Sequence, residues 1–166
     1  MNPSKSEITS HLEDYLEAIL LVGRETGAAH ASAVADRVGV TRASVTGALR
    51  ALADRGLIVY QPYQPVTLTE EGRALAQACL DRHEFLRRFF RDQLGMEDGE
   101  ADEVACRVEH VTNTTVLARL AEFSRFLADC RQIDVAWSSS GRLQCVRETS
   151  SDGCRGCDRA ALNISD

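Results

Sequence analysis

The sequence predicts a mainly α-helical chain whose N-terminal part is a winged helix-turn-helix. Two short helices, over residues 31–38 and 42–55, are separated by the tight turn Gly39-Val40-Thr41, which is the pattern of a helix-turn-helix. Two strand-like segments, 57–60 and 66–68, follow at once. A hairpin in that position is a wing. Longer amphipathic helices are predicted from there to residue 127.

The first predicted helix opens at Ser10, because Ser10-His-Leu-Glu13 has the pattern of a capping box. Gly23 and Gly27 bracket its end. Its apolar stripe consists of Leu12, Leu16, Ile19 and Leu20.

The second helix of the helix-turn-helix has the features of a recognition helix. Thr41 is placed to cap it, and small or polar residues fill its N-terminal turns, the end that such a helix presents to base edges. Arginines nearby suit phosphate contacts. The predicted DNA-binding residues are Arg37, Thr41, Arg42, Ala43, Ser44, Thr46 and Arg50.

After the wing, whose turn is Gln61-Pro-Tyr-Gln-Pro65, a long helix is predicted over roughly residues 70–94. Gly95 to Gly99 breaks it, and a further helix includes residues 106–110. Thr112-Asn-Thr-Thr115 offers caps for a last helix ending near Leu127. The phenylalanines of this half are expected in the core and a subunit interface: Phe85, Phe89, Phe90, Phe123 and Phe126.

Composition narrows the class of protein. The chain has 166 residues, of which 44% are apolar and 27% charged, as in globular proteins. It has no run of about 18 apolar residues and no apolar signal core, so a cytoplasmic protein is expected. In that compartment its six cysteines should be reduced or metal-bound. The net charge of −6 argues against a general nucleic-acid coat but permits a locally basic reading face.

Cys106, Glu109 and His110 stand at positions i, i+3 and i+4 of a predicted helix. This spacing places a thiol, a carboxylate and an imidazole on one face, as in half of a transition-metal site. The alternative is ordinary surface polarity beside a buried thiol. The sequence contains no zinc-hydrolase motif, no phosphate loop and no nucleophile beside a base, so an enzyme is not expected.

Five segments together resemble the metal-dependent repressors of the diphtheria toxin repressor and manganese transport regulator family. The segments occur in the family's order, and the resemblance covers roughly residues 8 to 128. They are Glu13-Asp-Tyr-Leu-Glu-Ala-Ile19, Ser44-Val-Thr46, Leu68-Thr-Glu-Glu-Gly-Arg73, Arg82-His83 with Phe85 to Phe89, and Cys106-Arg-Val-Glu-His110. The resemblance implies a homodimer with a winged-helix reader, a helical dimerisation half and a metal site between them. The implied metal ligands are Asp14, Glu17, His83, Cys106, Glu109 and His110.

The chain departs from the iron branch of that family at two positions. Arg87 stands where that branch has a glutamate, and Asp102 where it has a histidine, so its ancillary metal site is not expected. At the position of Cys106, the iron branch has a cysteine and the manganese branch has a glutamate. The expected architecture is that of the manganese branch without an SH3-like domain, divided into residues 1–72 for DNA binding, 73–128 for metal binding and dimerisation, and 129–166 as a Cys-rich tail.

The expected function is therefore a metal-dependent repressor of metal-homeostasis genes. It would bind double-stranded operator DNA as a metal-loaded homodimer, with neither a membrane nor a small-molecule substrate as partner. Fe(II) is favoured and Mn(II) is next, because carboxylates suit both ions and a thiolate favours softer or later metals. Zn(II) or Co(II) could also bind in vitro.

The tail contains a second constellation, Cys130, Cys145, Cys154 and Cys157. A C-x-x-C pair after two spaced cysteines in a polar tail indicates a four-thiolate site for Zn(II) or an iron–sulfur cluster. Reduced thiols or disulfides formed in air are the alternatives. An alternative function follows, in which a winged-helix regulator senses redox or iron–sulfur status through this tail and the internal site is structural.

Overall fold

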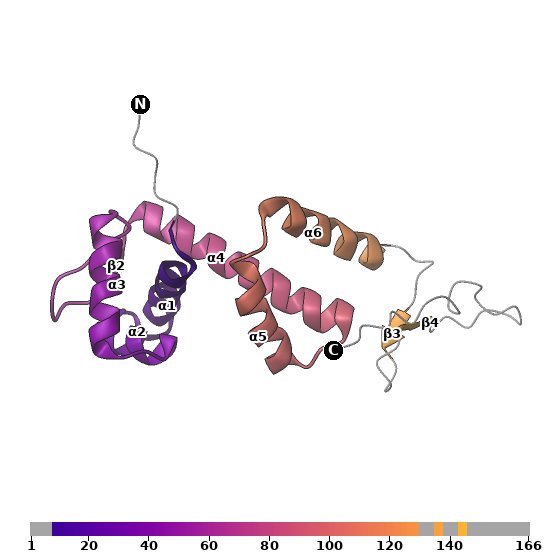
Figure 1. The fold of residues 1–166 in the computed structure, drawn as a ribbon, viewed down its shortest axis with the longest axis horizontal. Coiled ribbons are helices and arrows are strands. Elements are labelled where there is room, and N and C mark those ends of the chain that lie inside the picture. Colours follow the sequence, from indigo (N-terminus) through magenta and orange to yellow (C-terminus); the bar gives the residue numbers. More distant parts are fainter. Residues whose placement is uncertain (1–7, 130–134, 138–142, 146–166) are drawn as a thin grey trace, which may run out of the picture. The chain divides into compact units, whose positions relative to one another are not determined.

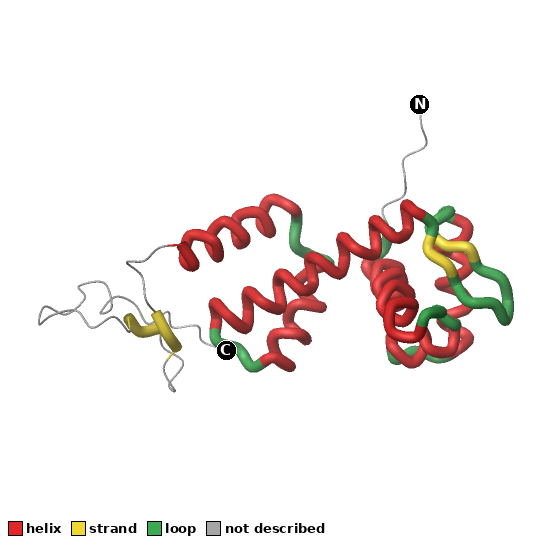
Figure 2. Tube along the Cα trace, turned by 180° about the vertical axis from the view of Figure 1, so that it is seen from behind, coloured by secondary structure: helices red, strands yellow, loops and turns green. Residues whose placement is uncertain are grey.

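The computed structural model describes residues 8–129, 135–137 and 143–145 (Figure 1). Within these ranges the chain is mainly helical (Figure 2), which confirms the predicted fold class. The chain divides into two compact units, one ending at Glu84 and the other beginning at Phe85, so the division falls inside one helix. None of the helices in the described ranges is long and apolar enough to cross a membrane.

Helix α1 spans Ser10–Thr26 and ends at Gly27, whose φ of 79° is left-handed. The predicted capping box is wrong. The N-cap is Thr9, without a side-chain capping bond, so Glu13 lies one position too late to complete a box. The Glu13 carboxylate instead accepts a hydrogen bond from Arg82 at 3.1 Å.

The helix-turn-helix is confirmed. Helix α2 spans Ala31–Val38 and α3 spans Arg42–Asp54. Gly39 makes the turn with a φ of 74°, a conformation that glycine adopts without steric cost. Thr41 is the N-cap, and its hydroxyl accepts a hydrogen bond from the Ser44 amide at 3.2 Å.

The core of the first unit lies among α1, α2, α3 and the wing. It consists of buried side chains that include Leu16, Ile19, Val34, Val45, Leu49 and Leu52, together with Tyr15, which lies outside the predicted apolar stripe of the first helix. Because these residues come from all three helices, their burial fixes the orientation of α3 on its neighbours.

The wing is also confirmed, as a short antiparallel hairpin. Strand β1, Ile58–Val59, pairs with β2, Thr67–Leu68, with Ile58 opposite Leu68. Helix α4, Glu70–Arg88, begins directly after it. Gly72 lies so close to the wing that a Cβ there would collide with the Leu57 carbonyl oxygen. Glycine at this position therefore allows the close approach of helix and wing.

The second unit includes the C-terminal turn of α4, a π-helical segment η1 (Phe89–Gln93), α5 (Asp98–Glu109) and α6 (Thr114–Asp129). The prediction of one α-helix from residue 70 to 94 needs correction, because Phe89–Gln93 adopt the wider π form. That turn coincides with an edge-on contact of Phe89 and Phe90, whose ring centroids lie 5.9 Å apart. A search for a 3.6-residue period does not detect such a local change.

The structure adds a hairpin that the sequence did not predict. Strand β3, Val135–Trp137, pairs antiparallel with β4, Leu143–Cys145. The Trp137 indole N–H donates to the Gln93 carbonyl at 2.9 Å. A Cβ on Gly95 would lie 2.6 Å from the Trp137 ring. Glycine at the end of η1 therefore makes room for the tryptophan.

Candidate metal centre and nucleic-acid interface

Helix α5 brings Cys106, Glu109 and His110 together. Their potential ligand atoms all lie within 4.8 Å of one another. His110 follows the last helical residue, and its φ of −78° and ψ of −18° keep it close to the helical path. The spacing read from the sequence therefore persists across the helix end.

Glu109 is the feature of this cluster that requires a chemical explanation. Its side chain is only 3% exposed and continues the buried stripe of Ala101 and Ala105 at four-residue spacing. An ionised carboxylate in such a position is costly unless a cation or several donors compensate it. The His110 Nε2 atom lies 3.4 Å from Glu109 Oε1, which provides one compensating group when the imidazole is protonated.

The donor set fits a divalent transition metal. A thiolate, a carboxylate and an imidazole are ligands that Fe(II), Mn(II) and Zn(II) accept in differing order of preference. Cys106 is exposed, whereas Cys79 is buried, so the thiol beside Glu109 is the accessible one of the two. When bound, the metal would supply positive charge that offsets the thiolate and the carboxylates.

The other three predicted ligands belong to the first unit. Asp14 and Glu17 lie on α1 and His83 on α4, and all three side chains are half-buried. The Arg82–Glu13 ion pair at 3.1 Å joins α4 to α1 one residue before His83 and Asp14. Sequence reasoning did not identify this pair, since only the opposite charges of two distant residues could have indicated it. Participation of Asp14, Glu17 and His83 in the site stays a prediction.

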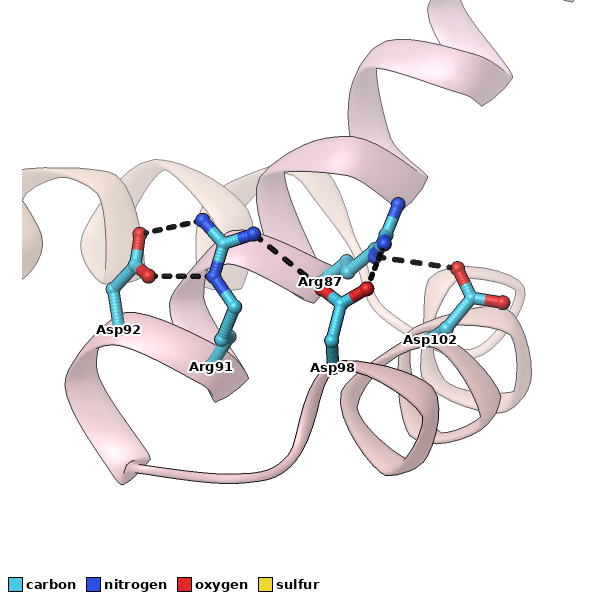
Figure 3. A network of polar contacts seen from close by, with 5 residues as sticks. All are labelled: Arg87, Arg91, Asp92, Asp98 and Asp102. Carbon is cyan, nitrogen blue, oxygen red and sulfur yellow. Dashed lines mark hydrogen bonds and ion pairs between the residues drawn. The ribbon is translucent and has the colours of Figure 1, made fainter.

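The two positions that depart from the iron branch contact each other. Arg87 pairs with Asp98 and, at 3.5 Å, with Asp102 (Figure 3). Arg91 extends the network to Asp98 at 3.4 Å and to Asp92 at 2.7 Å. The hydrogen bond from Arg87 lowers the pKa of Asp98 below its ordinary value. The network links the end of α4 and η1 to the first turns of α5, the helix that includes Cys106 and Glu109.

The predicted DNA-binding residues lie on or beside α3. Arg42, Ala43, Ser44 and Arg50 are exposed, and Thr46 is half-buried. Several have local partners: the Thr46 hydroxyl donates to the Arg42 carbonyl at 2.9 Å, and Arg37 bonds both carboxylate oxygens of Glu25 at 2.8 Å. Arg42 and Arg50 are thus exposed cations on the helix expected to enter the major groove.

The second predicted metal site falls almost entirely outside the described residues. Cys145 is the last residue of β4. Cys130, Cys154 and Cys157 lie outside the described ranges, so the four-cysteine site stays a prediction.

Comparison with known proteins assigns the chain to a class of DNA-binding, metal-dependent transcriptional regulators. Residues 7–66 match the N-terminal DNA-binding domain of the iron-dependent repressors. Residues 69–138 match their metal-binding and dimerisation domain. The chain belongs to this family, that of the diphtheria toxin repressor and the manganese transport regulator. The resemblance read from the sequence is confirmed, and so is the expectation of a transcriptional regulator rather than an enzyme.

Individual relatives agree with this assignment. An HTH-type transcriptional regulator of Methanocaldococcus jannaschii is 32% identical over 123 residues, covering 74% of this chain and 98% of the relative. The regulator MntR of Lysinibacillus sphaericus is 29% identical over 121 residues, covering 73% and 86%. A solved manganese-dependent transcriptional repressor in complex with manganese matches with a TM-score of 0.64 and 27% identity, covering 80% of this chain and 61% of that one. The chain thus spans less than two thirds of that solved relative.

Proposed function

We propose that this chain is an Fe(II)- or Mn(II)-dependent transcriptional repressor of metal-homeostasis genes that binds operator DNA as a metal-loaded homodimer. The observation that carries the proposal is the buried carboxylate of Glu109 beside Cys106 and His110. This cluster lies in the segment matched by a metal-binding domain, and the same chain contains a helix-turn-helix.

The proposed regulatory site combines these three residues with Asp14, Glu17 and His83. The family resemblance supports the inclusion of these three residues, because Asp14, Glu17 and His83 stand at its ligand positions in the sequence. His83 also lies within the segment matched by the metal-binding domain.

Charge supplies the coupling between metal and structure. Asp14, Glu17, Cys106 and Glu109 would place up to four negative charges close together, which without a cation favours protonation or separation. A divalent ion removes this repulsion and ties α1 to α5. Because α1 packs on the helices of the reader, the tie would set the spacing of two recognition helices for half-sites one DNA turn, about 34 Å, apart. Metal therefore selects the DNA-competent state through its higher affinity for it.

An exposed apolar face supports the homodimer. Phe123 and Phe126 of α6 are 51% and 55% exposed, and Val116 is exposed on the same side of the helix. All three lie within the segment matched by a dimerisation domain. A second copy of the chain would remove this surface from water.

The choice of metal follows from the donors. The solved relative in complex with manganese supports Mn(II). The Cys106 thiolate shifts the preference toward a softer or later ion, so we place Fe(II) first and Mn(II) second.

DNA binding under anaerobic metal titration tests the proposal. The duplex is selected from a random library with metal-loaded protein, and wild type is compared with Glu109→Gln and with Glu100→Gln, an exposed acidic residue of the same helix. We expect Fe(II) or Mn(II) to tighten binding by wild type and Glu100→Gln by about tenfold to a hundredfold, and Glu109→Gln to lose most of this response. Equal affinity of the wild type with and without metal would refute the proposal.

A further inference from the structure

The tip of the wing contains a tyrosine in an unusual backbone conformation. Tyr63 has a φ of 67° and is the one non-glycine residue with positive φ in the described part of the chain. The Gln64 amide donates to the Gln61 carbonyl at 3.1 Å, and Pro62 stands between Gln61 and Tyr63. A closing hydrogen bond, proline at the second position and positive φ at the third are the features of a type II turn.

Glycine or asparagine is the usual residue at that third position, because a Cβ makes the left-handed conformation costly. Tyrosine adds a large ring, and within the described residues the ring gains no packing in return, since Tyr63 is 101% exposed. A strained and wholly exposed aromatic residue that does not stabilise its own fold indicates a contact with a partner.

The surroundings of Tyr63 indicate the chemistry of that partner. The turn Gln61-Pro-Tyr-Gln-Pro65 is uncharged. Beside it is an open hollow of about 320 Å³ lined by Val59, Gln61, Gln64, Pro65 and Thr67. This surface offers amides, hydroxyls and apolar groups but no cation, in contrast to the exposed arginines of α3. It suits sugar rings and single hydrogen bonds to phosphate oxygens rather than neutralisation of phosphate charge.

Chain connectivity limits where the wing can reach. Strand β1 begins at Ile58, four residues after α3 ends at Asp54, and the two elements pack together. When α3 lies in the major groove, the wing is therefore held beside the adjoining DNA backbone.

We propose that Tyr63 is a DNA contact: its ring packs on a deoxyribose next to the half-site, and its hydroxyl donates to a backbone phosphate. This inference rests on the proposed function, because it requires binding to duplex DNA. Since no phosphate charge is neutralised, the contact releases no counterions and adds affinity without increasing the salt dependence.

The experiment measures the affinity of metal-loaded full-length protein for its selected duplex over a series of salt concentrations. Tyr63→Asn keeps a residue that tolerates positive φ, Tyr63→Phe removes only the hydroxyl, and Arg50→Ala removes a cation of α3. We expect Tyr63→Asn to bind about five- to twentyfold more weakly at every salt concentration, with an unchanged slope. Tyr63→Phe should show a smaller loss, whereas Arg50→Ala should reduce the slope by about one.

Thermal unfolding and phosphate ethylation complete the test. Tyr63→Asn should unfold at no lower temperature than wild type, because the turn loses strain. An ethylated phosphate beside each half-site should weaken binding by wild type and have no effect on Tyr63→Phe. Lower thermal stability together with weaker binding would show a structural role and overturn the inference.

Two further outcomes separate this inference from the proposed function. Equal affinity of Tyr63→Asn and wild type would overturn the DNA contact while leaving metal-dependent repression intact. Absence of metal-dependent DNA binding by the wild type would overturn both.

Discussion

Cys106 and Cys79 show how position gives one residue type two uses. Cys79 is 1% exposed and packs in the first unit as a small apolar side chain, with the Arg82 guanidinium 3.4 Å from its sulfur. Cys106 is exposed, and its sulfur and the potential ligand atoms of Glu109 and His110 all lie within 4.8 Å of one another. Of these two thiols, the second combines access with neighbouring potential ligands, so it is the one included in the proposed metal site.

The identity of this donor should set the order of metals. Replacing Cys106 with glutamate exchanges a soft thiolate for a hard carboxylate, and we expect Cys106→Glu to respond to Mn(II) about tenfold more strongly relative to Fe(II) than wild type does. Anaerobic DNA-binding titrations with Fe(II), Mn(II) and Zn(II) measure the ranking. Cys79→Ala is the matched control and should keep the wild-type order. An unchanged ranking in Cys106→Glu would show that the thiol is not a ligand.

At the scale of elements, the helix-turn-helix and wing could be predicted because their signals are local. Gly39 and Thr41 specify a turn and a cap within a few residues, and the apolar spacing of α2 and α3 specifies their inner faces. The capping box failed because Thr9 and Ser10 are both acceptable N-cap residues. Glu13, which would have distinguished them, is paired with Arg82, 69 positions away. A pattern of neighbouring residues could not predict that long-range ion pair.

The same limit applies to the metal-binding half. Periodicity located Cys106, Glu109 and His110 on one face of a helix, and the structure brings them together. Burial of Glu109 could not be read from spacing, because it depends on which face of α5 packs inward. The Arg87 network was likewise missed, since each charge alone looks like solvated surface. The resemblance identified Arg87 and Asp102 as departures but could not show that they contact each other.

The Arg87 network gives α5 a pH-dependent stability. Its arginine partners lower the pKa of Asp98 from the ordinary value of 3.8. A lowered folded-state pKa stabilises the fold above the unfolded-state pKa, and this contribution disappears as pH falls through the lower folded-state value. These side chains are about half exposed, so solvent screens the pairs and the effect should be modest.

Urea unfolding of chelator-treated protein between about pH 2 and pH 6 measures this contribution. We expect the difference in unfolding free energy between wild type and Asp98→Asn to be constant above about pH 4.5 and to shrink as pH falls below about 4. High salt should reduce the difference. Glu100→Gln, in the same turn of α5 but outside the network, controls for the loss of a carboxylate. If the difference in unfolding free energy between wild type and Asp98→Asn does not vary with pH, the pairing of Asp98 with the arginines is contradicted.

At the scale of the whole molecule, two groups of ligands compete for the role of sensor. One is the proposed regulatory site around Glu109, and the other is the predicted four-cysteine site at positions 130, 145, 154 and 157. The hairpin of β3 and β4 connects the cysteine group to the metal-binding half. Trp137 of β3 donates a hydrogen bond to the end of η1, and Cys145 is the last residue of β4. A tail that binds Zn(II) or an iron–sulfur cluster could therefore act on the metal-binding helices through this contact.

Paired variants distinguish the two arrangements. If the internal site is the sensor, Glu109→Gln with His110→Ala should abolish the response of DNA binding to Fe(II) and Mn(II), whereas Cys154→Ser with Cys157→Ser should retain it. The serine variants keep Trp137 and the hairpin, which truncation after Leu127 would remove. The opposite pattern would make the tail the sensor and the internal site structural. Iron and sulfide analysis of anaerobically purified wild type and serine variants then identifies what the tail binds, because a thiolate-held cluster requires those cysteines and Zn(II) contributes neither element.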